Sequence, residues 1–121
     1  MAGHLLYESV TLDNREKREL SRAVVDHWDY LDPCAKYTWV FDTLRFERWH
    51  KKSENICVRS LESSRRNIFI IDAPGDPRHI KNLTRGCSLA DAAILVIDAS
   101  VGGFESGYSS TGSTREHVIL A

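Results

Sequence analysis

The chain has 121 residues, of which 42% are hydrophobic and 27% charged, a composition typical of one globular domain rather than a disordered segment. Sixteen basic against seventeen acidic residues give a net charge of −1, which argues against a broad electrostatic surface for nucleic acid. The three cysteines show no CxxC spacing, and no apolar run approaches the length of a membrane span, so we expect reduced thiols, a cytoplasmic protein and no membrane contact.

A first helix is predicted near the N-terminus. Asp13 is a candidate N-cap, and Glu16 follows three residues later, which is the spacing of a capping box. The apolar positions that come next have helical spacing, so residues 14–28 are predicted to form an amphipathic helix. Pro33 is expected to end it, because proline disfavours the helical conformation of the residue before it. The face expected to be buried carries Leu20, Ala23, Val24 and Trp28.

A second helix is predicted from Tyr37 to Arg48. Its apolar face carries Trp39, and both Trp39 and Trp28 are expected to be core residues rather than platforms for stacking bases. Residues 49–54 are polar without a clear period, so a loop is expected there.

The period of the apolar positions then changes to two. Residues 55–61 alternate between apolar and polar faces, which predicts a half-buried strand. A turn over residues 62–67 leads to a second strand over residues 68–72. That strand is apolar on both faces, as is typical of an inner strand in a parallel or mixed sheet.

The C-terminal half is expected to continue the alternation of helices and strands. A helix is predicted over residues 78–85, with Gly86 as its stop, and residues 92–98 are predicted to be a third, buried strand. Residues 99–113 are expected to be a loop, and Thr114 to start a final helix. Strands that alternate with helices predict an α/β fold.

Two of the predicted strands end on an acid, Asp72 and Asp98. In open α/β sheets ligands bind beyond the carboxyl ends of the strands. Asp72 is followed by Gly75, so its carboxylate is a candidate to hold Mg²⁺ through water while the backbone N–H of Gly75 approaches a phosphate oxygen. The alternative is that Asp72 only caps the following turn. Asp98 has no glycine at that distance and is expected to cap its loop.

Five segments together resemble the GTPase domain of translation elongation factor 1-alpha and its close relatives. They are GHLLY (3–7), YTWVFDTLRFER (37–48), IIDAPGDPRHIKN (70–82), ADAAILVIDASVGGFESG (90–107) and TREHVILA (114–121). The DAPG element alone is shared by many translational GTPases, but the combination is specific. The resemblance implies one partial GTPase domain over residues 1–121, with a poorly matched helical region over residues 8–36 and a switch-like loop over residues 49–54.

The resemblance implies half of a nucleotide site. The family's metal and γ-phosphate residues correspond to Asp72 and Gly75, and Ser53 stands where the family has the metal-binding threonine of switch I. Asp72 and Ser53 are therefore the predicted Mg²⁺ residues. The family's glycine in the switch-like loop is replaced by Lys51. The predicted nucleotide-binding loop consists of Asp72, Ala73, Pro74, Gly75 and Asp76.

Asp76 stands where the family has the histidine that positions the attacking water. Such a group contributes about 10²–10⁴-fold in rate. A carboxylate roughly 4 Å from a phosphate oxygen is repelled by about 1 kcal/mol in water and about 4 kcal/mol at an intermediate dielectric. His79, one helical turn further on, is expected to be a surface residue rather than a replacement. No catalytic residue is therefore predicted.

The resemblance also implies parts that these 121 residues do not contain. No Gly-Lys dipeptide occurs, so the glycine-rich phosphate loop is absent, and the N-K-x-D element is expected beyond Ala121. The strand before the phosphate loop is central in the family's sheet. The expected fold is therefore a partial P-loop GTPase-like mixed sheet of about three strands with flanking helices and its central strand missing. Its open edges would promote aggregation or pair with a partner strand.

The function implied is that of a fragment of an elongation factor 1-alpha-like GTP-binding domain. The family delivers aminoacyl-tRNA to the ribosome in a GTP-dependent way, with Mg²⁺ and GTP as cofactors and a nucleotide exchange factor as a further partner. This chain alone is expected to be impaired in GTP binding and hydrolysis. The alternatives are a non-catalytic module that binds protein or RNA, including a strand-complementing partner, and a non-functional truncated copy.

Overall fold

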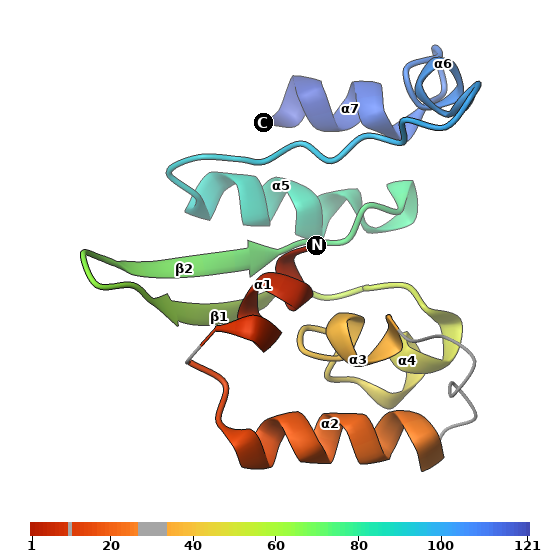
Figure 1. The fold of residues 1–121 in the computed structure, drawn as a ribbon. Helices are drawn as coiled ribbons and strands as arrows, with labels where there is room; N and C mark the ends of the chain where they lie inside the picture. Colours follow the sequence, from red (N-terminus) through yellow and green to blue (C-terminus); the bar gives the residue numbers. More distant parts are fainter. Residues whose placement is uncertain (10, 27–33) are drawn as a thin grey trace. The chain divides into compact units, whose positions relative to one another are not determined.

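The computed structural model describes residues 1–9, 11–26 and 34–121, and its contacts divide the chain into two units. Unit 1 consists of Met1–Ser53 and Cys57–Asp72, and unit 2 of Glu54–Ile56 and Ala73–Ala121. Figure 1 shows the order of the elements along the chain. Within the described ranges, no helix is both long and apolar enough to cross a membrane.

Helix α2 (Asn14–Asp26) begins at the predicted capping box. One carboxylate oxygen of Asp13 accepts the backbone N–H groups of Arg15 and Glu16 at 2.7 Å each, and the Glu16 carboxylate accepts the backbone N–H of Asp13 at 3.3 Å. These bonds satisfy N–H groups that have no partner inside the helix. The predicted start is confirmed. The predicted end of this helix, with Trp28 and Pro33, lies outside the described residues.

The single helix predicted over residues 37–48 is instead two short helices, α3 (Ala35–Thr38) and α4 (Arg45–His50). The segment between them buries three successive apolar side chains, Trp39, Val40 and Phe41. Successive side chains of a helix point about 100° apart, so a helix that has one buried face cannot bury three in a row. The chain therefore leaves the helical conformation here.

The core of unit 1 consists of two small clusters of buried side chains. Leu20 of α2 packs against both clusters and so links them. Burying each large apolar side chain stabilises the fold by about 1.5–3 kcal/mol. The prediction that Trp39 is a core residue is confirmed. The first cluster is Leu6, Val40 and Phe41, and the second is Val24, Ala35 and Trp39.

Helix α1 (Ala2–Glu8) packs closely against α3. Gly3 makes this approach possible, because a Cβ at this position would collide with the backbone carbonyl of Tyr37. The contact brings Leu6 into the first cluster. It also places Tyr7 and Tyr37 edge to face, with ring centroids 5.2 Å apart.

The sheet of unit 1 is an antiparallel pair, β1 (Cys57–Glu62) and β2 (Asn67–Asp72). Its register places Cys57 opposite Asp72 and Glu62 opposite Asn67, and the backbone N–H of Ser63 closes the turn onto the carbonyl of Arg66 at 3.0 Å. Both strands and the turn were predicted and are confirmed.

One face of this pair packs on the first cluster through Cys57, Leu61 and Ile70. The other face is open, because Val58 and Phe69, which point to it, are exposed. The prediction that the second strand is buried on both faces is therefore wrong in this chain. Apolar residues on both faces of a strand permit burial on both sides. Burial of the second face also needs other residues that pack over it, and the strand's own sequence does not specify these.

Unit 2 contains a 3₁₀ turn over Pro77–His79 and the helices α5 (Ile80–Leu89), α6 (Gly103–Gly107) and α7 (Ser113–Leu120). The start of α7 is within one residue of its prediction. Gly86 does not end α5, which continues through it to Leu89, and Gly86 is buried there. Helix α6 lies inside the segment predicted as a loop.

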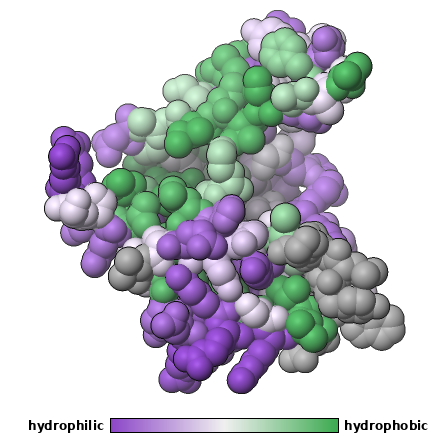
Figure 2. Space-filling model, viewed as in Figure 1, coloured by the Kyte–Doolittle hydropathy of each residue, from purple (hydrophilic) through white to green (hydrophobic). Residues whose placement is uncertain are grey.

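The third predicted strand, residues 92–98, is extended but belongs to no sheet in the described part of the chain. Ile94 is 85% exposed and Val96 66% exposed. A strand is defined by the hydrogen bonds it exchanges with a neighbour, and this segment has none. The fold is therefore α/β as expected, but the expected count of about three strands is not confirmed. Figure 2 shows the large apolar surface over the region that carries α5 to α7.

Candidate functional site

Asp72, the last residue of β2, lies in unit 1 with two further acids and Ser53. Asp42 and Glu47 are 6% and 3% exposed. Burial raises the pKa of Asp72 to about 6, and the negative charges of Asp42 and Glu47 add to this rise. A hydrogen bond from Ser53 works in the opposite direction. The structure therefore brings the two predicted metal residues, Asp72 and Ser53, into one cluster.

Ser53 also connects Asp72 to Asp42. The Ser53 hydroxyl donates a hydrogen bond of 2.7 Å to a carboxylate oxygen of Asp42. Burial raises the pKa of Asp42, and the Ser53 hydrogen bond lowers it. Arg48 donates from its Nε to the backbone carbonyl of Asp42 at 2.6 Å and stacks over the Trp39 ring at 4.6 Å. Arg48 is thus a nearby positive charge that offsets Asp42 and Glu47.

The cluster offers oxygen atoms of the kind that a hard divalent cation prefers. Mg²⁺ commonly takes one or two carboxylates and fills its other positions with waters and phosphate oxygens. Asp72 and Ser53 fit that limited demand. In the described ranges, no group of three or more His, Cys, Asp or Glu side chains is arranged to hold a metal ion. The residues present therefore fit a metal that shares its coordination with a ligand, not a closed structural site.

Asp42 and Glu47 are site residues that the sequence did not reveal. Asp42 directly follows the three buried residues 39–41, and Glu47 lies in the first turn of α4. The one available signal was an acid placed straight after an apolar run. The Glu47 carboxylate accepts the backbone N–H of Leu44 at 3.1 Å, which explains its burial by a local role.

Lys51 determines how the chain turns from α4 toward Ser53. It has the left-handed conformation, φ 53° and ψ 39°, which is unfavourable for a residue with a side chain. This is the position at which the resemblance has glycine. The backbone N–H of Lys52 bonds to the carbonyl of Glu47 at 3.1 Å and so closes the end of the helix. Lys51 thus adopts a left-handed turn conformation that glycine would adopt without a steric penalty.

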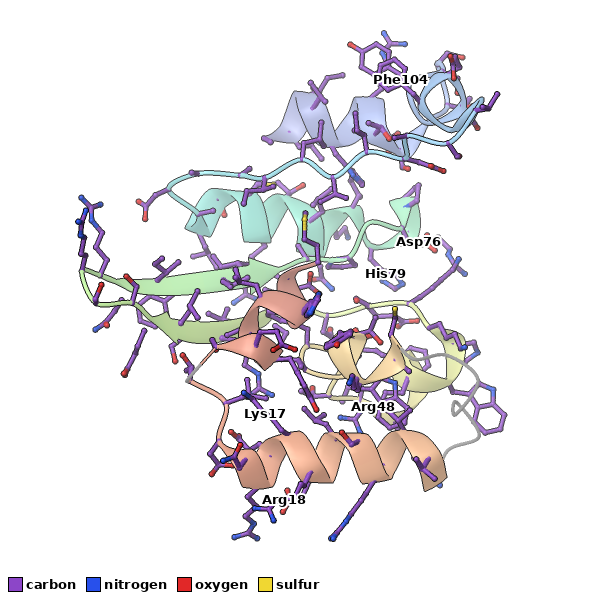
Figure 3. The ribbon with its side chains drawn as sticks, viewed as in Figure 1. Lys17, Arg18, Arg48, Asp76, His79 and Phe104 are labelled. Carbon is purple, nitrogen blue, oxygen red and sulfur yellow. The ribbon has the colours of Figure 1, made fainter. Side chains whose placement is uncertain are left out.

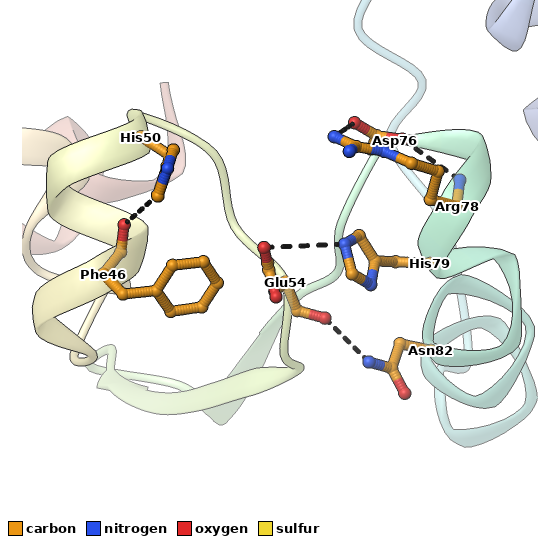
Figure 4. Close-up of polar contacts among 7 residues, drawn as sticks. All are labelled: Phe46, His50, Glu54, Asp76, Arg78, His79 and Asn82. Carbon is orange, nitrogen blue, oxygen red and sulfur yellow. Dashed lines mark hydrogen bonds and ion pairs between the residues drawn. The ribbon is translucent and has the colours of Figure 1, made fainter.

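Asp76, in unit 2, is paired with Arg78 (Figure 4). One carboxylate oxygen accepts the Arg78 backbone N–H and its Nε at 3.0 Å each, and the other accepts Nη2 at 2.7 Å. This two-pronged contact neutralises the carboxylate and raises the pKa of Arg78. The repulsion expected between a bare Asp76 and a phosphate is thus offset, by a partner that sequence reasoning missed.

His79 contacts Glu54, a residue of the same unit. Its Nε2 lies 3.7 Å from a carboxylate oxygen of Glu54, and Asn82 donates to the Glu54 backbone carbonyl at 2.7 Å (Figure 4). The His79 side chain is 26% exposed, so it is half-buried rather than a plain surface residue. That His79 does not replace the family's histidine stays a prediction.

Gly75 is exposed, and Pro74 before it is fully buried. A Cβ on Gly75 would meet only the edge of the His117 ring, at 3.4 Å. Its φ lies outside the left-handed region, so the fold itself makes little demand for glycine here. Ala73 is half-buried. Any strict requirement for glycine at position 75 must therefore come from a ligand that approaches the backbone.

Asp98 caps its loop as predicted. Its carboxylate accepts the backbone N–H of Ser100 at 2.9 Å, and this hydrogen bond lowers the pKa of Asp98. The two acids that were predicted to end strands therefore differ in chemistry. Asp72 is held in a partly buried cluster that disfavours its charge, whereas Asp98 is stabilised in its charged form.

Comparison with known proteins shows the family to which the chain belongs. Residues 1–121 match the family described as the elongation factor Tu GTP binding domain. The chain is 42% identical over 121 residues to elongation factor 1-alpha of Euglena gracilis, a match that covers 98% of this chain and 26% of that protein. The chain thus spans about a quarter of the length of this relative. Because the family match extends over the whole sequence, the chain belongs to the elongation factor Tu GTP-binding domain family.

Proposed function

We propose that this elongation factor 1-alpha-like domain retains the metal and γ-phosphate side of a GTP site. The observation that carries the proposal is the cluster in which Asp72, Ser53 and Asp42 lie together at the end of β2. A pKa near 6 leaves Asp72 mostly ionised at neutral pH, and a cation beside it would favour that charged form further.

In this proposal Asp72 and Ser53 would hold Mg²⁺, which supplies positive charge that neutralises the phosphates of GTP. Ser53 can turn its hydroxyl away from Asp42 to offer an oxygen lone pair. The backbone N–H of the exposed Gly75 would face a phosphate oxygen. Ala73, Pro74 and Asp76 complete the nucleotide-binding loop that we propose.

We expect no GTP hydrolysis by this chain alone. Asp76 holds the position of the family's water-positioning histidine, and its carboxylate is committed to Arg78. A carboxylate in such a pair is a poor base, because the guanidinium favours its deprotonated form and accepts no proton itself.

GTP-dependent delivery of aminoacyl-tRNA to the ribosome, with a nucleotide exchange factor, is the cytoplasmic role that we propose by resemblance.

The test is titration of fluorescent GTP and GDP into the purified chain, with and without Mg²⁺. We expect weak GTP binding that requires Mg²⁺ and falls about tenfold or more in Asp72→Asn. Asp98→Asn is the control, since it also removes a carboxylate that directly follows an apolar run, and it should bind like the wild type. Absence of binding at millimolar nucleotide, or equal binding by Asp72→Asn, would overturn the proposal and leave the family relation as ancestry only.

A further inference from the structure

Unit 1 has a second polar site, a shallow and widely open pocket of about 380 Å³ lined by α1 and α2. Four of its lining residues come from α2 at positions i, i+3, i+4 and i+7, a spacing that places them along one side of a helix. The fifth comes from α1. None of the five is acidic. The lining residues are Tyr7, Asn14, Lys17, Arg18 and Ser21.

Positive charge gathers around the Tyr7 ring. The ammonium of Lys17 lies 5.7 Å from the ring centroid, and that of Lys36 lies 5.0 Å from it. The two ammonium groups are therefore no farther apart than the sum of these distances. Arg18 brings a third cation to the pocket lining. Figure 3 shows Lys17 and Arg18 on α2.

These cations form no ion pair with any described residue. Lys17 donates to the backbone carbonyl of Ser9 at 3.1 Å, and Arg18 donates from Nε to that of Asn14 at 2.9 Å. Each bond uses one donor, whereas an ammonium has three N–H groups and a guanidinium has five. Both side chains therefore keep donors for a ligand while their stems are held in place.

Two acids of α2, Glu16 and Glu19, lie outside this pocket. Glu19 accepts a hydrogen bond of 2.9 Å from Nε of Arg15, so its charge is already balanced. Glu16 and Glu19 line a different pocket, of about 290 Å³. Helix α2 thus separates its charges and leaves the side beside Tyr7 positive, which is a local patch on a chain of net charge −1.

We propose that this pocket binds a phosphate group that carries two negative charges, either as inorganic phosphate or as the phosphomonoester of a small molecule. A dianion would balance the cations gathered at Tyr7, and charge-assisted bonds from Lys and Arg to phosphate oxygens are the strong kind. The Tyr7 and Ser21 hydroxyls, 3.2 Å apart, and the Asn14 amide add polar groups to the lining. This site shares no residue with the Asp72 cluster and does not depend on the proposed function.

The test is calorimetric titration of the whole chain at low salt with three probes: inorganic phosphate, uridine 5′-monophosphate and uridine. We expect both phosphates to bind with saturation at about 10 mM or below, and uridine to give no signal. Tighter binding of the monophosphate would identify an organic ester as the source, and equal binding would show that free phosphate suffices. Either result supports the site.

Variants distinguish binding in this pocket from general electrostatic attraction of phosphate to the basic side chains of the protein. Lys17→Gln and Arg18→Gln should each weaken phosphate binding about fivefold or more. Arg15→Gln, on the same helix but outside the pocket, should leave phosphate binding unchanged. Arg18 is exposed, so its replacement leaves the core intact. No saturable binding of either phosphate, or an equal loss in Arg15→Gln, would overturn the proposal.

Discussion

Lys51 is the residue whose backbone conformation fits its side chain least well. The left-handed conformation costs a non-glycine residue roughly 1–2 kcal/mol, whereas glycine adopts it without a steric penalty. Glycine is also the usual residue just after a helix end of this kind. We expect Lys51→Gly to raise the free energy of unfolding by about 0.5–1 kcal/mol after the larger entropy loss of glycine on folding.

Urea unfolding followed by circular dichroism measures this change. Lys52→Gly is the matched control, because its backbone lies outside the left-handed region and the added flexibility should only destabilise the fold. If Lys51→Gly is no more stable than the wild type, the strain assigned to this turn is absent.

Asp72 should make the stability of the chain depend on pH. Its pKa is raised from 3.8 to about 6, so the folded state holds a proton that the unfolded state releases. This contribution is fully present below pH 3.8 and is lost as the pH rises through about 6. Asp72→Asn, which carries no charge, should therefore unfold at higher urea than the wild type above pH 6, and this advantage should disappear near pH 4.

Asp98 offers a control of opposite sign. The pKa of Asp98 is lowered in the folded state. Asp98 therefore stabilises the fold at pH values above the pKa that it has in the unfolded chain, and this stabilisation is lost as the pH falls. Asp98→Asn should thus be no more stable to urea than the wild type at neutral pH. Parallel curves for the wild type and Asp72→Asn between pH 4 and pH 7 would show that the folded state does not disfavour the charged Asp72 carboxylate.

At the scale of elements, α2 depends on its capping box. Asp13 satisfies two backbone N–H groups at 2.7 Å, and its loss would leave them to solvent. We expect Asp13→Ala to lower the free energy of unfolding by about 1 kcal/mol. Asn14→Ala, the next residue, should have little effect on stability. An unchanged midpoint in Asp13→Ala would mean that packing of Leu20 and Val24 alone sets the helix start.

The elements that could be predicted are those specified by short-range signals. The capping box placed the start of α2, and apolar alternation placed β1 and its turn. The break between α3 and α4 could not be predicted, because it depends on three successive side chains being buried by other parts of unit 1. Residues 92–98 have the composition of a strand, but a ladder needs a neighbour that local sequence does not supply.

The candidate site was predictable only to the extent that the resemblance reached it. Asp72 and Ser53 were found by their positions in family motifs, and the structure places them together. Asp42 and Glu47 are brought near Asp72 only by the tertiary fold of unit 1, so no spacing in the sequence predicts them. The pairing of Asp76 with Arg78 was easier to predict from the sequence, since the two residues are only two positions apart.

At the scale of the whole molecule, apolar burial is uneven. The buried apolar clusters in the described residues belong to unit 1. In the other unit residues 94–97 are a run of exposed apolar side chains, and the extended backbone of 92–98 is unpaired. Such a segment, rich in β-branched residues and free of proline, is a template for intermolecular pairing. We therefore expect concentration-dependent association through residues 92–98.

Replacing Val96 by Lys should suppress this association, since a charge in the middle of an apolar strand opposes both pairing and stacking. Val101→Lys is the matched control: Val101 is a fully exposed valine that lies outside the extended run. Light scattering against concentration should show growth for the wild type and Val101→Lys, and a flat response for Val96→Lys. Hydrogen exchange adds an independent reading, because amides of 92–98 in the dilute chain should exchange rapidly while those of β1 and β2 are protected. Protection of 92–98 at low concentration would mean that its backbone is paired within one chain, and that the exposed segment is not the cause of association.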